Sequence, residues 1–280
     1  MGYLMPGDDE GIDAMAEASL PAAPRIRRRH LWVPWLVALI TLFLWWLVTA
    51  LKLFPPVALP SPGAVVHQLV VTATIGYSGS TLWADIGASV GRITVGFVAA
   101  VIVGVPIGFW MASNRVIFAA VDPLLQFLRP IPPLAYIPVM VIWFGTGELG
   151  KTVLIFFCTI PIIIISAMSG VKNVQETRLR VAQVFGATPL QQFRYVVLPS
   201  ALPEIFTGMR VGIGVAWTCL VAAEMIAAQS GLGSMIETAG GELQISVVFV
   251  GILFIGLIGY LMEFIVRTIE HRMVPWKGKA

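Results

Sequence analysis

Six long apolar runs constrain the fold of this chain more than any other feature of its sequence. They occupy residues 31–51, 86–112, 131–144, 152–168, 211–228 and 245–266. An α-helix rises about 1.5 Å per residue, so about 20 apolar residues cross a hydrocarbon core of about 30 Å. Only 12% of the residues are charged, against about 25% in soluble domains. We therefore predict an all-α membrane protein with six transmembrane helices.

The run at 131–144 is the shortest of the six and contains Pro132, Pro133 and Pro138. Proline removes a backbone donor and weakens a helix. Membrane helices nevertheless tolerate proline where neighbouring helices satisfy the freed backbone groups. We retain this run as the third transmembrane helix.

The distribution of lysine and arginine orients these helices. If the N-terminus is cytoplasmic, the inside segments hold 14 of the 18 lysines and arginines, Arg129 among them. The outside segments hold only Lys52 and Lys151, while Arg92 and Arg210 lie near or within helices. Cytoplasmic loops carry an excess of lysine and arginine. We therefore expect a multi-pass membrane protein, in contact with membrane lipid, with its N- and C-termini cytoplasmic.

Residues 1–30 form a separate segment before the first run. Residues 1–24 combine five acidic residues with alanine, proline and glycine, a composition typical of disorder. The basic cluster "RIRRRH" at 25–30 then stands directly before the apolar run, whereas a secretory signal begins with its basic residues. We expect a disordered cytoplasmic tail whose basic end fixes the orientation, followed by a membrane domain at 31–280.

The sequence "GTGELGKT" at 145–152 matches the phosphate-loop pattern G-x-x-x-x-G-K-[ST]. A phosphate loop joins a buried strand to a helix, and its lysine contacts the phosphates. Here both flanking segments are predicted membrane helices, and the charge distribution places Lys151 outside, away from ATP. We therefore interpret the match as accidental and expect a tight turn whose glycines adopt unusual φ values.

The longest polar interruption in the second half of the chain lies at about 172–200, on the predicted cytoplasmic side. "QETRLRVAQVFG" has the periodicity of a helix that ends or bends at Gly186. A second short helix begins near Pro189 and is expected to stop at Leu198 and Pro199. Two short helices joined at a glycine would form a compact projection from the membrane surface.

The projection carries apolar residues that suit a protein interface. Phe185, Leu190 and Phe193 are candidate anchors, because exposed apolar side chains usually mark a contact surface. A loop that packs on its own bundle is the alternative that the pattern leaves open.

The spacing from Ala182 through Gly186 to Val196, Leu198 and Pro199 resembles the "EAA–G–I-LP" signature of ABC importer permeases. In that family this loop is the coupling helix, which inserts into a groove of a cytoplasmic ATPase. The sequence departs from the signature at Arg180 and Val181, which replace its glutamate and first alanine. The resemblance implies an ATPase-coupling loop made of Arg180, Ala182, Phe185, Gly186, Pro189, Leu190, Phe193, Leu198 and Pro199.

Four further segments resemble the nitrate, sulfonate and taurine branch of these permeases, so that the likeness extends over about residues 30–280. They are "RPIPPLAYIPVMVIWFGTGELGK", "LPSALPEIFTGMRVGIGVAW", "LVAAEMIAAQSGLG" and "MVPWKG". The resemblance implies a type I importer permease that works as a homodimer in the bacterial inner membrane. Two ATPase subunits, which bind ATP and magnesium, and a periplasmic binding protein complete the importer. The implied substrate is taurine or a related sulfonate, with other sulfonates, nitrate or similar small solutes as alternatives. The chain is then a transport subunit that binds no cofactor itself, not an enzyme.

Ionisable residues inside predicted membrane helices are functional candidates. Glu224 lies late in the fifth run, and a hydrogen bond or ion pair between helices, a gating role and substrate contact are its alternative roles. Arg92, Arg210 and Trp217 are further candidates for the pathway or its gate, although Arg210 is expected to extend toward the cytoplasmic interface. Small residues such as Gly208 predict close packing of the fifth helix in the bundle.

Two other functional classes remain as alternatives. An ion-coupled secondary transporter would use intramembrane acids directly, but no inverted repeat is visible and the loop at 172–200 argues for an ATPase partner. A membrane-embedded enzyme would need a catalytic constellation, and no Ser/His/Asp, HExxH or paired-carboxylate spacing occurs. Nothing points to nucleic acid, and no metal-ligand spacing links His30, His67, His271, Cys158 and Cys219.

Overall fold

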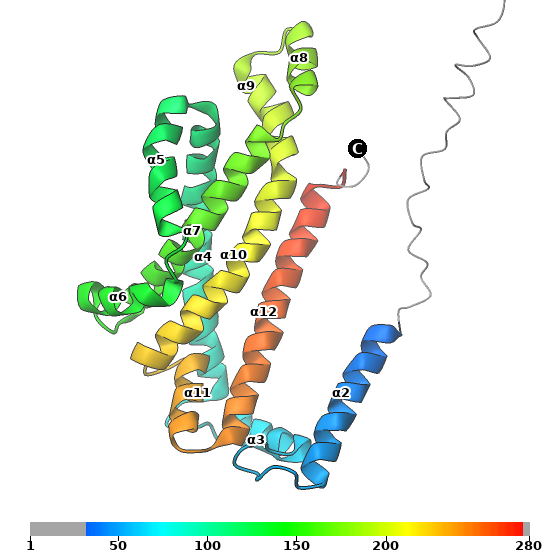
Figure 1. Ribbon diagram of the computed structural model, residues 1–280, viewed down its shortest axis with the longest axis vertical. Helices are drawn as coiled ribbons and strands as arrows, with labels where there is room; N and C mark the ends of the chain where they lie inside the picture. The colour runs from blue at the N-terminus through cyan, green and yellow to red at the C-terminus, as the bar shows by residue number, and fades with distance from the viewer. Residues whose placement is uncertain (1–31, 277–280) are drawn as a thin grey trace, which may run out of the picture.

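The computed structural model describes residues 32–276, and the elements in this range are helical (Figure 1). The predicted tail at 1–30 lies outside the described residues. In chain order the α-helices are α2 (Val33–Ala50), α3 (Pro62–Thr74), α4 (Leu82–Ser113), α5 (Arg115–Leu128), α6 (Ile137–Phe144), α7 (Glu148–Lys172), α8 (Glu176–Val184), α9 (Pro189–Gln192), α10 (Leu198–Ala227), α11 (Leu232–Gly241) and α12 (Ile245–Met273). A 3₁₀ turn, η2 (Pro133–Tyr136), precedes α6, and a π-helical turn, η3 (Phe193–Val197), precedes α10.

Five of the described helices are long and apolar enough to cross a membrane, namely α2, α4, α7, α10 with its preceding turns, and α12. A sixth crossing requires α5 and the segment Pro133–Phe144 to be counted together, although they are bent by 95° relative to each other. The predicted all-α membrane fold is therefore confirmed, with the third crossing built differently from the prediction.

The predicted helix at 131–144 is wrong in its bounds. This stretch forms η2 and the eight-residue α6, which is only about 12 Å long. Pro132 is extended, with ψ 132°, because a residue that precedes proline avoids the helical region. If this stretch is counted with α5 as one crossing, the crossing begins at α5, whose amphipathic pattern the search for apolar runs did not detect.

Arg129 lies between the two parts of this bent pair. It is the C-cap of α5 and follows 14 helical residues, so it lies about 21 Å along the helix from its start. The lysine and arginine count placed it in a cytoplasmic segment, just before the predicted run at 131–144.

The helices α4, α7 and α10 form the packed centre of the bundle, with α7 lying along both of the others. Backbones approach closely at glycine. A Cβ added at Gly208 of α10 would lie 2.2 Å from Ser166 Oγ of α7, and one added at Gly212 would lie 3.2 Å from Thr159 Cγ2. The predicted close packing of the fifth membrane helix is confirmed at these two positions.

The helix α2 stands apart from this bundle (Figure 1). None of its residues is buried. It contacts the bundle near its C-terminal end, where the Trp45 ring stacks on Phe249 of α12 with centroids 5.7 Å apart. Trp45 Nε1 also donates to the Pro60 carbonyl at 3.0 Å. The apolar surface of α2 is thus left for lipid or for another protein chain.

One predicted boundary at α10 is wrong. Leu198 and Pro199 do not end a helix but begin α10, since proline is well accommodated in the first turn, where its missing N–H is not needed. Just before them, the Leu198 N–H donates to the Phe193 carbonyl, which gives η3 its wider turn. At the other end, residues 232–241, between the fifth and sixth apolar runs, form the short helix α11.

Candidate functional site

The helices α8 and α9 project from the bundle at the end where α12 also finishes (Figure 1). Gly186 joins them with φ +73°, as the predicted helix–glycine–helix pattern requires. The Ala187 N–H donates to the Ala182 carbonyl at 3.0 Å and the Gly186 N–H to the Gln183 carbonyl at 2.9 Å. This pair of bonds is a Schellman motif, in which a left-handed residue ends the helix.

The second helix of the projection is fixed by its own cap. The Thr188 side chain accepts from the Gln191 N–H, and the Gln191 side chain accepts from the Thr188 N–H, which forms a capping box ahead of Pro189. At the start of α8, Arg180 pairs with Glu176 at 2.7 Å, and both side chains are exposed. Arg180 is therefore engaged within its own helix.

The tip of the projection is apolar and exposed. Phe185 is 86% exposed and Leu190 74% exposed, and nothing within the described residues covers them. Phe193 is 40% exposed, and its ring packs edge-on against Phe109 of α4 with centroids 5.2 Å apart. It ties the projection to the bundle, so Phe185 and Leu190 remain as the free anchors.

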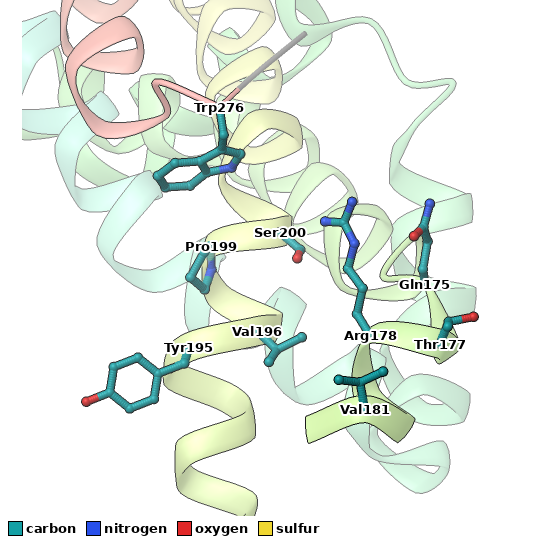
Figure 2. A pocket seen from close by; sticks show the side chains of 9 residues that line it. All are labelled: Gln175, Thr177, Arg178, Val181, Tyr195, Val196, Pro199, Ser200 and Trp276. Atoms are coloured by element: carbon teal, nitrogen blue, oxygen red, sulfur yellow. The ribbon is translucent and has the colours of Figure 1, made fainter. Parts of the chain in front are cut away.

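A pocket of about 400 Å³ lies between the projection and the end of α12. Figure 2 shows the Arg178 guanidinium on the side of Ser200, with Trp276 across the pocket and the Tyr195 ring extended away from Arg178. Pro199 lines the same pocket. Leu198 and Pro199 thus connect the projection to α10 and do not form its tip.

A buried polar network lies at the opposite end of the bundle, centred on Arg92 of α4. Its Nη1 donates to Glu224 Oε1 at 2.6 Å and to the Ser230 carbonyl at 2.8 Å. Its Nε and Nη2 donate to the Glu148 carboxylate of α7. Glu224 is fully buried, whereas the Glu148 side chain is 65% exposed and also accepts from Lys151. Of the roles expected for Glu224, the ion pair between helices is the one observed.

The same network holds the start of α11. Three successive backbone N–H groups donate into it at 2.9–3.0 Å: Gly231 to Asp85, Leu232 to the Ser89 hydroxyl, and Gly233 to Glu224. These are donors that a helix start leaves without intrahelical partners. Asp85, Ser89 and Glu148 were not singled out from the sequence, because their partners on other parts of the chain come close only when the bundle assembles.

The stretch that matches a phosphate loop has no phosphate cradle. It follows helix α6 where a phosphate loop follows a strand, and its last five residues, 148–152, already belong to α7. Gly145 has φ +72°, as expected for a tight turn. Lys151 is buried, with Nζ donating to Glu148 at 3.3 Å.

The remaining two candidates lie between α10 and α12. Arg210 pairs with the buried Glu270 across 3.5 Å, so it is held by an ion pair within the bundle. Trp217 is buried in the main hydrophobic core beside Gly259. Neither residue lines the cavity described next.

A cavity of about 730 Å³ lies between the bent α5–α6 segment and helices α7 and α10. Its wall is mainly apolar, and Arg129 is the one charged residue among the described residues that line it. Tyr136 and Ser166 supply hydroxyl groups to the wall. Arg129 was missed as a site residue because the sequence analysis placed it in a cytoplasmic segment. The one-sided apolar pattern of α5 is the signal that identifies it.

A hydrogen bond also ties the loop before α4 to the turn after α11. Tyr77 Oη donates to Glu242 Oε2 at 2.6 Å. Burial, and then the bond to the Glu242 carboxylate, raise the pKa of Tyr77 to about 12. The phenol therefore remains a neutral donor throughout the physiological range.

Comparison with known proteins places this architecture among importers. The chain is 44% identical to the taurine transport system permease protein TauC of Escherichia coli over 86% of this chain and 88% of that protein. It is 34% identical to the nitrate import permease protein NrtB of Synechocystis over 79% and 82% of the two chains. The inward-facing MetNI methionine ABC transporter has a similar fold, with a TM-score of 0.58 at 19% identity over 70% of this chain and 99% of that one.

The resemblance found in the sequence is thereby confirmed. Residues 104–275 match the family described as the binding-protein-dependent transport system inner membrane component. This match includes α5, the cavity, the α8–α9 projection and most of the buried network. The chain belongs to this family of inner-membrane permease subunits.

Proposed function

We propose that this chain is the permease subunit of an ATP-driven importer, in which α8 and α9 form the ATPase-coupling surface. The observation that carries this proposal is the projection itself, two capped helices joined at Gly186 with Phe185 and Leu190 exposed at the tip. Exposed aromatic and aliphatic side chains on a rigid support suit insertion into a groove of a partner. The coupling loop then spans about 172–200 within a permease domain at 31–280, and both termini face the cytoplasm.

The assembly has the partners typical of such importers. Two cytoplasmic ATPase subunits bind ATP and magnesium, and a periplasmic binding protein delivers the substrate at the opposite end. A second copy of this chain completes the pathway, because the exposed α2 and the cavity beside α5 and α6 leave apolar surface without cover within the described residues. Closure of the ATPase pair moves the two coupling surfaces together and shifts the bundle between inward-open and outward-open states.

The substrate that we propose is taurine or a related sulfonate. The 44% identity to a taurine permease over most of both chains supports it. Nitrate is the second candidate, because the nitrate permease of Synechocystis is also similar at 34% identity.

Reconstitution tests both the proposed ATP-driven import and the proposed substrate. The chain is purified with its cognate ATPase and binding protein and placed in proteoliposomes, and uptake of labelled taurine and of labelled nitrate is measured. We expect taurine uptake that requires ATP hydrolysis and the binding protein. Uptake driven by an ion gradient without the ATPase would instead support a secondary transporter, and preferential nitrate uptake would correct the substrate.

A further inference from the structure

The cavity between the bent α5–α6 segment and the α7–α10 pair has an unusual charge distribution. Its wall is dominated by aliphatic, aromatic and proline side chains, and Arg129 stands alone as a charged residue among the described residues that line it. The other polar groups there include the hydroxyls of Tyr136 and Ser166. At about 730 Å³ the cavity has the size of a small-molecule site.

Arg129 differs from Arg92 and Arg210, the two arginines that form ion pairs between helices of the described bundle. Arg92 is paired with Glu148 and Glu224, and Arg210 is paired with Glu270. None of the ion pairs between described residues includes Arg129. Arg129 is exposed and is the one charged residue on an otherwise mainly apolar wall, among the described residues that line the cavity. Its guanidinium is therefore open to pair with an anionic ligand that enters the cavity.

We propose that Arg129 is the anion-recognition residue of the transport pathway and that it binds the sulfonate group of the passing substrate. This inference rests on the proposed function. A guanidinium donates two parallel hydrogen bonds to a planar pair of oxygens, and a sulfonate offers three equivalent oxygens. The Tyr136 and Ser166 hydroxyls are further donors on the same wall, and the apolar residues accommodate a short alkyl chain.

A single cation also suits transport better than a cluster of cations. A substrate must bind well enough to enter and weakly enough to leave, so one guanidinium favours anions over cations without trapping them. A small anion such as nitrate has the same charge, so Arg129 selects for negative charge, and the apolar wall favours the sulfonate that carries an alkyl chain.

Thiol labelling tests this inference without any transport assay. Val211 lines the cavity and is exposed, so Val211→Cys is introduced after Cys158→Ala and Cys219→Ala remove the buried free thiols. The labelling rates of a sulfonate-bearing and a trimethylammonium-bearing methanethiosulfonate are compared. We expect Arg129→Gln to lower the ratio of anionic to cationic rate by about tenfold, since a lone charge in a low-dielectric cleft concentrates counter-ions by that order.

Matched variants make this result decisive. Arg129→Lys keeps the charge and should keep most of the ratio. Arg115→Gln removes a cation from the other end of the same helix and should leave the ratio unchanged. An unchanged ratio in Arg129→Gln, or no labelling by either reagent, would overturn the proposal.

Uptake measurements separate this inference from the proposed function. In proteoliposomes with ATPase and binding protein, Arg129→Gln should lower taurine uptake by about tenfold, the equivalent of losing one good interaction. ATPase recovery and the Kd of the binding protein should not change. If the parent shows no uptake, the proposed function fails and the labelling ratio still decides the role of Arg129. If the parent and Arg129→Gln take up taurine equally, only the role of Arg129 fails.

Discussion

Arg92 and Glu224 form a buried ion pair across 2.6 Å between α4 and α10, although 132 residues separate them in the sequence. The pair is completed by Glu148 and by backbone groups around the start of α11. Because Glu224 is fully buried and its carboxylate is occupied, it acts here as a structural residue that fixes α11 on the bundle. The substrate-contact alternative has no support in this arrangement.

Glu224→Ala should strongly destabilise the protein. The change leaves the Arg92 guanidinium buried with one carboxylate fewer and removes the acceptor of the Gly233 N–H, and breaking one side of a buried pair typically costs about 3–5 kcal/mol. Thermal unfolding of the purified chain in detergent measures the effect. Glu224→Gln should lose less, since its amide oxygen still accepts one of these bonds.

An exposed pair provides the control. Glu176→Ala removes the partner of Arg180 on α8, where both side chains face solvent, and should leave the unfolding temperature unchanged. Equal effects of Glu224→Ala and Glu176→Ala would show that the buried network contributes little to stability.

Lys151→Ala should leave ATP hydrolysis by the assembled complex unchanged. Lys151 is bound to Glu148 inside α7 and faces no phosphate cradle, and Glu148 retains Arg92 in the variant. Hydrolysis by the purified complex and photolabelling with an ATP analogue are the two measurements. If the ATP analogue labels this chain and the labelling is lost in Lys151→Ala, the phosphate-loop interpretation would be correct after all.

Local patterns in the sequence were enough to predict part of this structure. The apolar runs gave the helical membrane class because run length depends only on neighbouring residues. The spacing around Gly186 gave two short helices, which the Schellman motif and the capping box explain. Leu198 and Pro199 were misread, since a proline that ends one helix and a proline that begins another look alike in sequence.

The rest depends on tertiary structure. Arg129 was assigned to a cytoplasmic segment and not to a site, because the cavity that it lines forms only when α5 and α6 pack beside α7 and α10. Glu224 and Arg92 were each singled out as costly intramembrane charges. Their pairing, and the roles of Asp85 and Ser89, arise only from the packing of α4 against α10.

Gly208→Ala should weaken the packing of α7 on α10. The added Cβ would lie 2.2–2.3 Å from Oγ and Cβ of Ser166, so the helices must separate, at a cost of about 1–3 kcal/mol. Unfolding temperature is the measurement. Ser166→Gly should restore part of the loss, because it removes both clashing atoms. Gly214→Ala on the same helix meets no atom within 4 Å and should be neutral, so equal losses at the two glycines would contradict the packing argument.

Gly186→Val should separate insertion of the permease from its coupling to the ATPase. Gly186 has φ +73°, and an ordinary side chain there costs about 1–2 kcal/mol, more when branched at Cβ. No atom lies within 4 Å of the added Cβ, so the strain acts through the backbone and displaces the tip that carries Phe185 and Leu190. ATPase recovery in pull-downs should fall by about tenfold for each 1.4 kcal/mol of lost binding, and uptake should fall with it.

Two variants show whether the loss depends on backbone conformation at this particular place. Gly186→Asn should retain most ATPase binding, because asparagine tolerates the left-handed region. Gly79 has a similar φ of +81° and open space around its Cβ position, but it lies in the turn before α4, at the opposite end of that helix from α5. Gly79→Val imposes the same strain away from the projection and should leave ATPase recovery at the parental level. If Gly186→Val complexes also retain their ATPase and transport normally, α8 and α9 are not the coupling surface.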